Sequence, residues 1–305
     1  MSSIVISDDN PFQNLITETD NDPKQLQDAY EAHRVKRNAQ QKAAILADDF
    51  PGWKIDDILM RLDGPRKEDG YVDPRHCLVI WARPPSAIRE LVAWIQNELK
   101  TVAPSLWMMP PDNLHLTILE LAHSLTKPEI ENLVQTLESA TNGGPKQIRE
   151  YPTTHRSRLL KPVVSFDSSA LALSFLPAAG ESISTNETKD EYSYHHLRRD
   201  IFELARQANI SVGSRYIVPS AHVTIARFIN HDGFTVRKGE NEDQLDRASV
   251  RLLIEKIEEI NRKLVSDYWP QSDGTIRDGG DWVVGDDKGF TIRRDRVWYG
   301  GGEDV

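Results

Sequence analysis

Two short segments of this chain carry the same pattern of histidine and threonine separated by one apolar residue. The first contains His115 and Thr117, and the second contains His222 and Thr224, 222 − 115 = 107 residues further along. The aliphatic residues around both segments are typical of strands. Side chains two positions apart in a strand point to the same face. Each segment therefore presents an imidazole and a hydroxyl together and buries aliphatic residues on its other face.

These residue types suit the transfer of protons around a phosphate group. An imidazole has an unperturbed pKa of about 6.5, so it can accept or donate a proton near neutral pH. Displacement at phosphorus is roughly in line, so two histidines on opposite sides would act as base and acid. We interpret His115 and His222 as this pair, and Thr117 and Thr224 as hydrogen-bond donors to the phosphate oxygens. Which histidine is the base stays open.

A simpler reading is that each motif is a half-buried strand with an incidental histidine. Two copies, each following a proline-containing turn, favour function over coincidence. The elements that must position them repeat in order. The first half reads strand, helix, strand and motif strand. The second half reads two strands, helix, strand and motif strand. We therefore expect two equivalent halves facing each other across a cleft. Their expected strands are 76–82, 106–109, 162–166, 170–175 and 214–217, and their helices are 87–101, 127–140 and 192–208.

The remaining segments are expected to be peripheral. Residues 1–50 form an N-terminal extension, disordered to about residue 21 and then helical, and residues 51–305 form the domain. The helix could pack on the domain, cover the cleft, or do neither. Its basic cluster from Arg34 to Arg37 is interpreted as a solvated face. His195 and His196 are adjacent on a helix, so they are a poor chelating pair and are expected at the surface.

Composition limits the function further. The chain has 305 residues, a formal net charge of −10 and a single cysteine, Cys77. A long nucleic-acid duplex needs a basic surface, so a small or terminal phosphate is the expected partner. One cysteine allows no intrachain disulfide and indicates a cytoplasmic or nuclear location. No apolar run is long enough for a membrane helix, and the sequence signals no metal and no cofactor. We expect a monomer.

The segments Asn113–Thr117 and Pro219–Arg227 resemble the two motifs of the two-histidine (2H) phosphoesterase superfamily, over about residues 75–299. This group includes RNA 2′,3′-cyclic phosphodiesterases and ADP-ribose cyclic phosphate hydrolases. The resemblance implies an α+β, bilobal fold, with two antiparallel sheets lining a central cleft and helices packed outside. It also implies a metal-independent hydrolase that opens cyclic phosphates on nucleotides or RNA 3′ ends. The alternatives are a non-catalytic nucleotide- or RNA-binding module and a 2′-5′ RNA end-joining enzyme.

The chain also departs from the compact members of that superfamily. It has a longer spacing between the motifs, with added loops near 143–160 and 179–191, and it has the N-terminal helix. Strand alternation places Arg227 opposite to His222, which predicts a structural role for Arg227. Tyr194, Tyr216 and Phe228 are candidates for stacking on a base. Residues Gly300–Gly302 read as a flexible tail.

Overall fold

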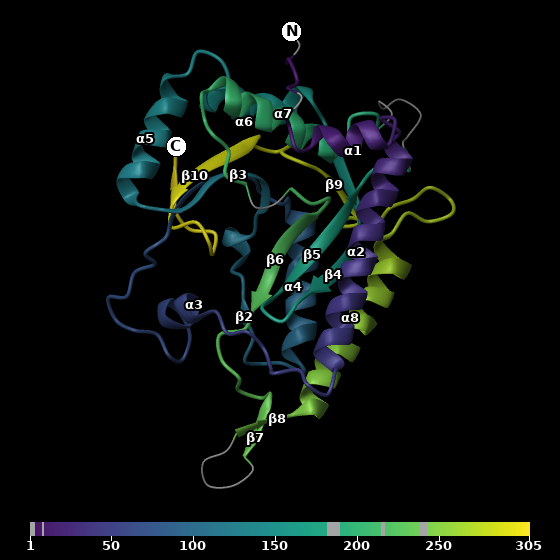
Figure 1. Ribbon diagram of the computed structural model, residues 1–305. Coiled ribbons are helices and arrows are strands. Elements are labelled where there is room, and N and C mark those ends of the chain that lie inside the picture. The colour runs from purple at the N-terminus through teal and green to yellow at the C-terminus, as the bar shows by residue number, and fades with distance from the viewer. Residues whose placement is uncertain (1–3, 8, 182–189, 215–216, 238–242) are drawn as a thin grey trace.

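The computed structural model describes residues 4–7, 9–181, 190–214, 217–237 and 243–305 (Figure 1). The helices within these ranges are α1 (Gln13–Glu18), α2 (Pro23–Leu46), α3 (Asp57–Leu62), α4 (Ser86–Lys100), the 3-10 helix η1 (Pro111–Asn113), α5 (Lys127–Ser139), α6 (Pro145–Thr154), α7 (Tyr194–Gln207) and α8 (Arg247–Tyr268). The strands are β1 (His76–Ala82), β2 (Trp107–Met108), β3 (Leu116–Leu125), β4 (Arg158–Phe166), β5 (Ala170–Pro177), β6 (Ala221–Arg227), β7 (Thr235–Arg237), β8 (Asp243–Leu245), β9 (Asp281–Val283), β10 (Phe290–Asp295) and β11 (Glu303–Asp304).

A large antiparallel sheet organises these elements. Its strands run in the order β11-β10-β1-β3-β6-β5-β4-β9, and β2 pairs with β6. The prediction of an α+β fold with antiparallel strands is confirmed. We expected two sheets, whereas the described strands form one sheet of nine and a separate β7–β8 pair. The two halves meet where β3 pairs with β6 through a single residue pair, Leu116 with Val223.

Strand β1 contributes side chains to a buried cluster on each face of the sheet. On β1, Leu78, Ile80 and Ala82 belong to the main hydrophobic core, and Trp81 and its face-sharing neighbours belong to a second, small cluster. Alternation therefore buries both faces of this strand, as its continuous apolar run predicts. Figure 1 shows α2 running alongside α8, next to β4 and β5. The long helix of the N-terminal extension thus packs on the sheet.

Several peripheral segments differ from expectation. We expected disorder up to about residue 21, but α1 forms there and Phe12 is fully buried. The division at residue 50 stays a prediction. The glycine tail is packed, because Gly300 has φ +82° and lies so close to Asn113 that an added Cβ would stand 2.4 Å from its carbonyl oxygen. Only a residue without a side chain fits this approach.

Candidate active site

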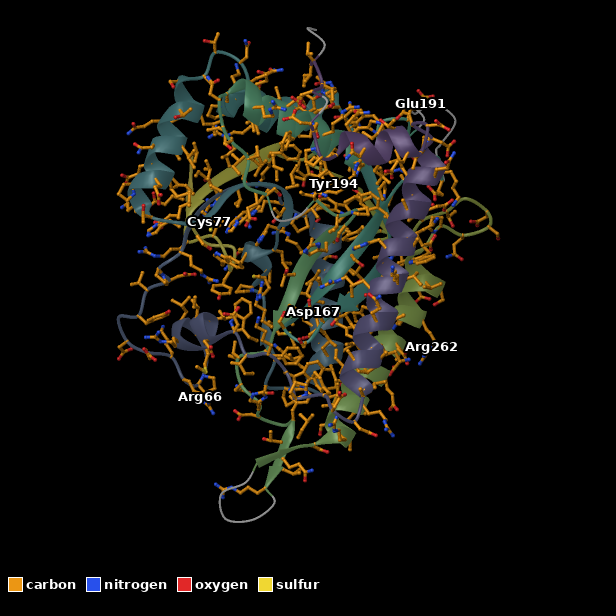
Figure 2. The ribbon with its side chains drawn as sticks, viewed as in Figure 1. Arg66, Cys77, Asp167, Glu191, Tyr194 and Arg262 are labelled. Atoms are coloured by element: carbon orange, nitrogen blue, oxygen red, sulfur yellow. The ribbon has the colours of Figure 1, made fainter. Side chains whose placement is uncertain are left out.

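A cavity of about 500 Å³ opens over the centre of the sheet. Its floor comes from β1, β3, β6 and β5, and α2 contributes one wall. Cys77 of β1 and Asp167 of the β4–β5 turn, both labelled in Figure 2, also line it. All four residues predicted from the motifs line this one cavity: His115, Thr117, His222 and Thr224.

The pairing of β3 with β6 fixes how the two motifs lie relative to each other. Leu116 is opposite Val223 in an antiparallel register. Continuing this register by one residue places His115 across from Thr224, and Thr117 across from His222. Directly opposite side chains have Cβ atoms about 5 Å apart, and diagonal neighbours lie about 7–8 Å apart. The two imidazoles are the diagonal pair, so one phosphate group fits between them.

His115 is held by contacts on both of its sides. Its ring stacks on Trp81, with ring centroids 3.9 Å apart and an interplanar angle of 18°. Its Nδ1 donates to the carbonyl oxygen of Asn113 at 2.7 Å. In the neutral ring the proton therefore sits on Nδ1, and Nε2 can accept one. Burial is the main cause that lowers the pKa of His115 to about 4, and the positive charge of Arg83 lowers it further.

His222 has a comparable setting on the other strand. Its Nδ1 lies 3.0 Å from the hydroxyl oxygen of Ser220. Burial lowers the pKa of His222 to about 4, the charges of Arg198 and Arg37 lower it further, and the carboxylate of Asp167 opposes them. Both imidazoles are therefore neutral at pH 7 while the cavity is empty. One of them must gain a proton before the pair can act as base and acid.

A β-bulge follows the threonine in each motif strand. The pairing of β3 with β1 passes from Thr117 directly to Leu119, so Ile118 is an extra residue. The pairing of β6 with β5 skips Ile225 in the equivalent position after Thr224. A bulge inserts one residue and reverses the alternation of side chains beyond it. Each motif strand therefore turns a third side chain toward the cavity.

These third side chains are Glu120 on β3 and Arg227 on β6, and both line the cavity. Our prediction that Arg227 lies opposite to His222 was wrong, because simple alternation ignores the bulge at Ile225. Among the influences that lower the pKa of the two motif histidines, the charge of Arg227 is the smallest.

Asp56 orients the guanidinium of Arg227. The Arg227 Nη1 donates to the Asp56 carboxylate at 3.3 Å, and the Tyr299 hydroxyl donates to the other oxygen of this carboxylate at 2.7 Å. The Arg227 Nε is buried and has no hydrogen-bond partner among the described residues. A buried donor without a partner is costly unless a ligand satisfies it. Arg227 therefore brings a donor without a described partner to the lining of the cavity.

The two threonine hydroxyls are placed for the same task. Neither hydroxyl forms a hydrogen bond with another residue in the described part of the chain. Thr117 contributes only its backbone carbonyl, which accepts from the Tyr194 hydroxyl at 3.2 Å. Both hydroxyls are therefore available to an oxygen of a bound phosphate.

The basic cluster of α2 does not form a uniformly solvated face. Arg34 is buried, and its Nη1 donates to the carbonyl oxygen of Lys161 at 2.7 Å. Arg37 forms an ion pair with Asp167 at 2.8 Å, and both lie at the cavity. Val35 and Lys36 between them are exposed, as expected. The helical spacing of Arg34 and Arg37, three positions apart, places them on one side of the helix.

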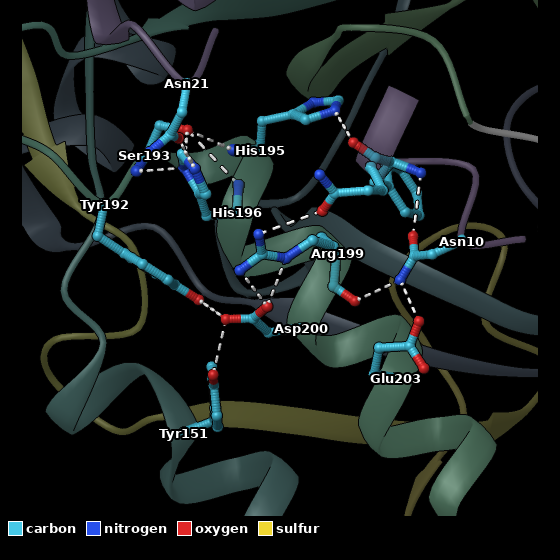
Figure 3. A network of polar contacts seen from close by, with 12 residues as sticks. Asn10, Asn21, Tyr151, Tyr192, Ser193, His195, His196, Arg199, Asp200 and Glu203 are labelled. Carbon is cyan, nitrogen blue, oxygen red and sulfur yellow. Dashed lines mark hydrogen bonds and ion pairs between the residues drawn. The ribbon is translucent and has the colours of Figure 1, made fainter. Parts of the chain in front are cut away.

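His195 and His196 are buried on α7, whereas we expected them at the surface. Figure 3 shows the polar network around them. His195 Nε2 lies 2.8 Å from the Phe12 carbonyl oxygen, and His196 Nε2 lies 2.6 Å from the Asn21 side-chain oxygen. Both rings therefore tie α7 to the N-terminal segment. Across the described ranges, no three His, Cys, Asp or Glu side chains are grouped to hold a metal ion.

Two of the three stacking candidates, Tyr194 and Phe228, are buried away from the cavity. Tyr194 is fully buried, and Phe228 is buried and stacked on Trp53 at 4.1 Å between ring centroids. Tyr216 lies outside the described residues. The aromatic rings that do line the cavity include Trp81 and Trp298.

Comparisons with known proteins leave the family open. No family model matches the chain, and no curated protein matches it either. Among solved structures, the chain is similar to a conserved protein of unknown function from Agrobacterium tumefaciens. That match has 10% identity and a TM-score of 0.46, and covers 87% of this chain and 97% of that one. None of the helices in the described ranges is both long and apolar enough to span a membrane.

Proposed function

We propose that this protein is a metal-independent phosphodiesterase of the 2H type, which opens 2′,3′-cyclic phosphates on nucleotides or RNA 3′ ends. The observation that carries the proposal is that both histidines and both threonines line one cavity, at the point where the motifs are joined by the pairing of Leu116 with Val223. The bilobal 2H fold is part of the proposal, since the sheet has two halves that meet at β3 and β6.

The charge of the cavity suits an anionic substrate. Among the described lining residues are four arginines and two carboxylates, Glu120 and Asp167. The arginines are Arg34, Arg37, Arg198 and Arg227. The balance of 4 − 2 = +2 contrasts with the net charge of −10 for the chain. A local positive field in an acidic protein attracts a small anion and leaves long nucleic acids repelled by the rest of the surface.

The reaction proceeds by one in-line displacement. One neutral imidazole takes a proton from water as its oxygen forms a bond to phosphorus. The bond from phosphorus to one ribose oxygen breaks on the opposite side, and the other ring, as imidazolium, gives that oxygen its proton. Thr117, Thr224 and Arg227 donate hydrogen bonds to the non-bridging oxygens, where negative charge increases in the transition state. The product is a ribose phosphomonoester with one free hydroxyl.

Two further readings use the same cavity. A nucleotide- or RNA-binding module would bind the phosphate without turnover. An end-joining enzyme would open the same cyclic phosphate with an RNA 5′-hydroxyl in place of water, so that a phosphodiester forms as the bond to one ribose oxygen breaks. The presence of both histidines and both threonines in one cavity favours a catalyst over a binding module.

The test measures the opening of 2′,3′-cyclic nucleotides in the presence of excess chelator. We expect wild type to be active, and His115→Ala and His222→Ala each to lose about 10²–10⁴-fold in kcat. His231→Ala is the matched control, because His231 is an exposed histidine outside the cavity. Full activity in either motif variant, or loss of wild-type activity on chelation, would contradict the proposal. Binding of nucleoside monophosphates without any turnover would favour the binding module.

A further inference from the structure

We propose that the α2 wall of the cavity is a second anion subsite, which binds another phosphate group of the same substrate. The inference rests on the proposed function and narrows its substrate class. The preferred substrate would be a nucleotide with a 2′,3′-cyclic phosphate and a second phosphate elsewhere on the molecule. That second phosphate is either a terminal monoester or the phosphodiester that links a preceding nucleotide.

Arg34 gives this wall a buried positive charge. The side chain is 8% exposed, and its Nη1 donates to two backbone carbonyl oxygens, those of Lys161 at 2.7 Å and Ser174 at 3.5 Å. No carboxylate of the described residues forms an ion pair with it. Burial lowers the pKa of Arg34 to about 10, so the guanidinium remains charged at neutral pH. The guanidinium also lies over the Trp269 ring, 5.8 Å from the ring centroid, and the charge of Glu31 opposes the effect of burial on its pKa. Neither contact is an ion pair, so an anion in the cavity would offset part of the cost of burying this charge.

Arg37 supplies a second cation that can change partners. Its ion pair with Asp167 has a 2.8 Å contact, and the Arg37 side chain is 52% exposed. Exposed ion pairs of this kind contribute little to stability, so a phosphate can replace Asp167 at low cost. A guanidinium offers two parallel donors that match two phosphate oxygens.

The subsite is distinct from the position of the reacting phosphate. The residues around the reacting phosphate come from β3, from His115 immediately before it, and from β6, whereas Arg34 and Arg37 come from α2. Arg34 contacts the backbone of Ser174 on β5, and Ser174 lies opposite His222 on β6. Adjacent strands are about 4.8 Å apart. An anion at the α2 wall would therefore lie beside the reacting phosphate, within the same cavity of about 500 Å³.

The test compares three substrates that share one base and one 2′,3′-cyclic phosphate. The first has a 5′-hydroxyl, the second has a 5′-phosphate, and the third is a dinucleotide. We expect wild type to prefer the second or third over the first by about 10- to 100-fold in kcat/KM. A preference for the second alone identifies a terminal phosphate, and a preference for both shows that a phosphodiester suffices. Absence of any preference would overturn the inference.

Variants of two neighbouring cations show whether α2 causes the preference. Arg37→Ala should remove it, and Lys36→Ala should keep it, because Lys36 is an exposed cation of α2 that does not line the cavity. A preference that survives in Arg37→Ala would overturn the inference. Both changes are on exposed side chains, so both variants should fold, which circular dichroism verifies.

A binding measurement separates this inference from the proposed function. If wild type opens no cyclic phosphate, titration calorimetry with a nucleoside 3′,5′-bisphosphate and with the matching 3′-monophosphate still tests the subsite. The bisphosphate should bind about 10-fold more tightly or better to wild type, and Arg37→Ala should bind the two equally. Equal binding of both ligands to wild type would refute the subsite irrespective of catalysis.

Discussion

The pH dependence of kcat/KM should differ from that of kcat, because substrate changes the charge around the two motif histidines. In the empty cavity the pKa of His115 and that of His222 are each about 4. At pH 7 the protonated fraction of either ring is therefore about 10^(4 − 7), or about one in a thousand. Since kcat/KM reports on the free protein, it should fall about tenfold for each pH unit above about pH 5.

A bound phosphodiester shifts this balance. Its negative charge lies about 4 Å from a ring that donates to it. The attraction between this charge and the imidazolium is then about 4 kcal/mol at an effective dielectric constant of about 20. Because about 1.4 kcal/mol corresponds to one pH unit, the pKa of the ring rises by about three, to about 7. The alkaline limb of kcat should therefore lie near pH 7, while that of kcat/KM lies near the value for the empty cavity.

Initial rates with a 2′,3′-cyclic nucleotide between pH 4 and pH 9, with chelator present, would separate the two limbs. Circular dichroism at each pH verifies that the protein remains folded at the acidic end. Two alkaline limbs at the same pH would refute the reasoning, because the bound phosphate would then exert no charge effect on the histidines.

Three further predictions concern residues for which the sequence predicted a different role or position. Arg227→Met should lower kcat by about 10²–10³-fold through the loss of a phosphate donor, and Arg227→Lys should lower kcat less. Steady-state kinetics measures both changes. Equal kcat in wild type and Arg227→Met would exclude this role. Gly300→Ala should lower the melting temperature more than Gly274→Ala, because both glycines have positive φ but only Gly300 would drive a Cβ into Asn113; similar melting temperatures would contradict this. The two buried histidines of α7 have pKa values of about 3 and about 4, below the unfolded value of 6.5, so the unfolded chain binds more protons as the pH falls through this range. The stability they contribute is present above pH 6.5 and should decrease by about 2 kcal/mol per ring between pH 6.5 and pH 5, which urea unfolding at the two pH values measures.

Sequence alone predicts the motif strands well because their alternation is local. It misses the residues beyond the bulges, since an extra residue such as Ile118 or Ile225 looks like any other strand residue. A signal is nevertheless present: in both strands two apolar residues follow the threonine, and a charged residue, Glu120 or Arg227, comes next. Two consecutive apolar residues followed by a charge, in both copies, could have indicated the same change of face twice.

The position of α2 could not be predicted for a different reason. Composition predicts the helix itself, but its location depends on partners more than a hundred positions away. Tyr30, for example, lies 2.8 Å from His195, and both side chains are buried only because the N-terminal segment packs on α7. Adjacent histidines on a polar helix resemble a solvated pair until that packing is known. Tertiary contacts, which leave no periodic pattern, decide both cases.

The order of synthesis gives the placement of α2 a consequence for folding. The helix leaves the ribosome before its partners, because Arg37 bonds Asp167, 130 positions later, and Lys42 bonds Glu258, 216 positions later. Contacts of such long sequence separation form slowly, because the intervening chain must first be ordered. A nascent chain therefore holds α2 without its partners until α8 has emerged. We expect ligand-binding competence to appear late during refolding, after most of the helical circular dichroism signal has returned.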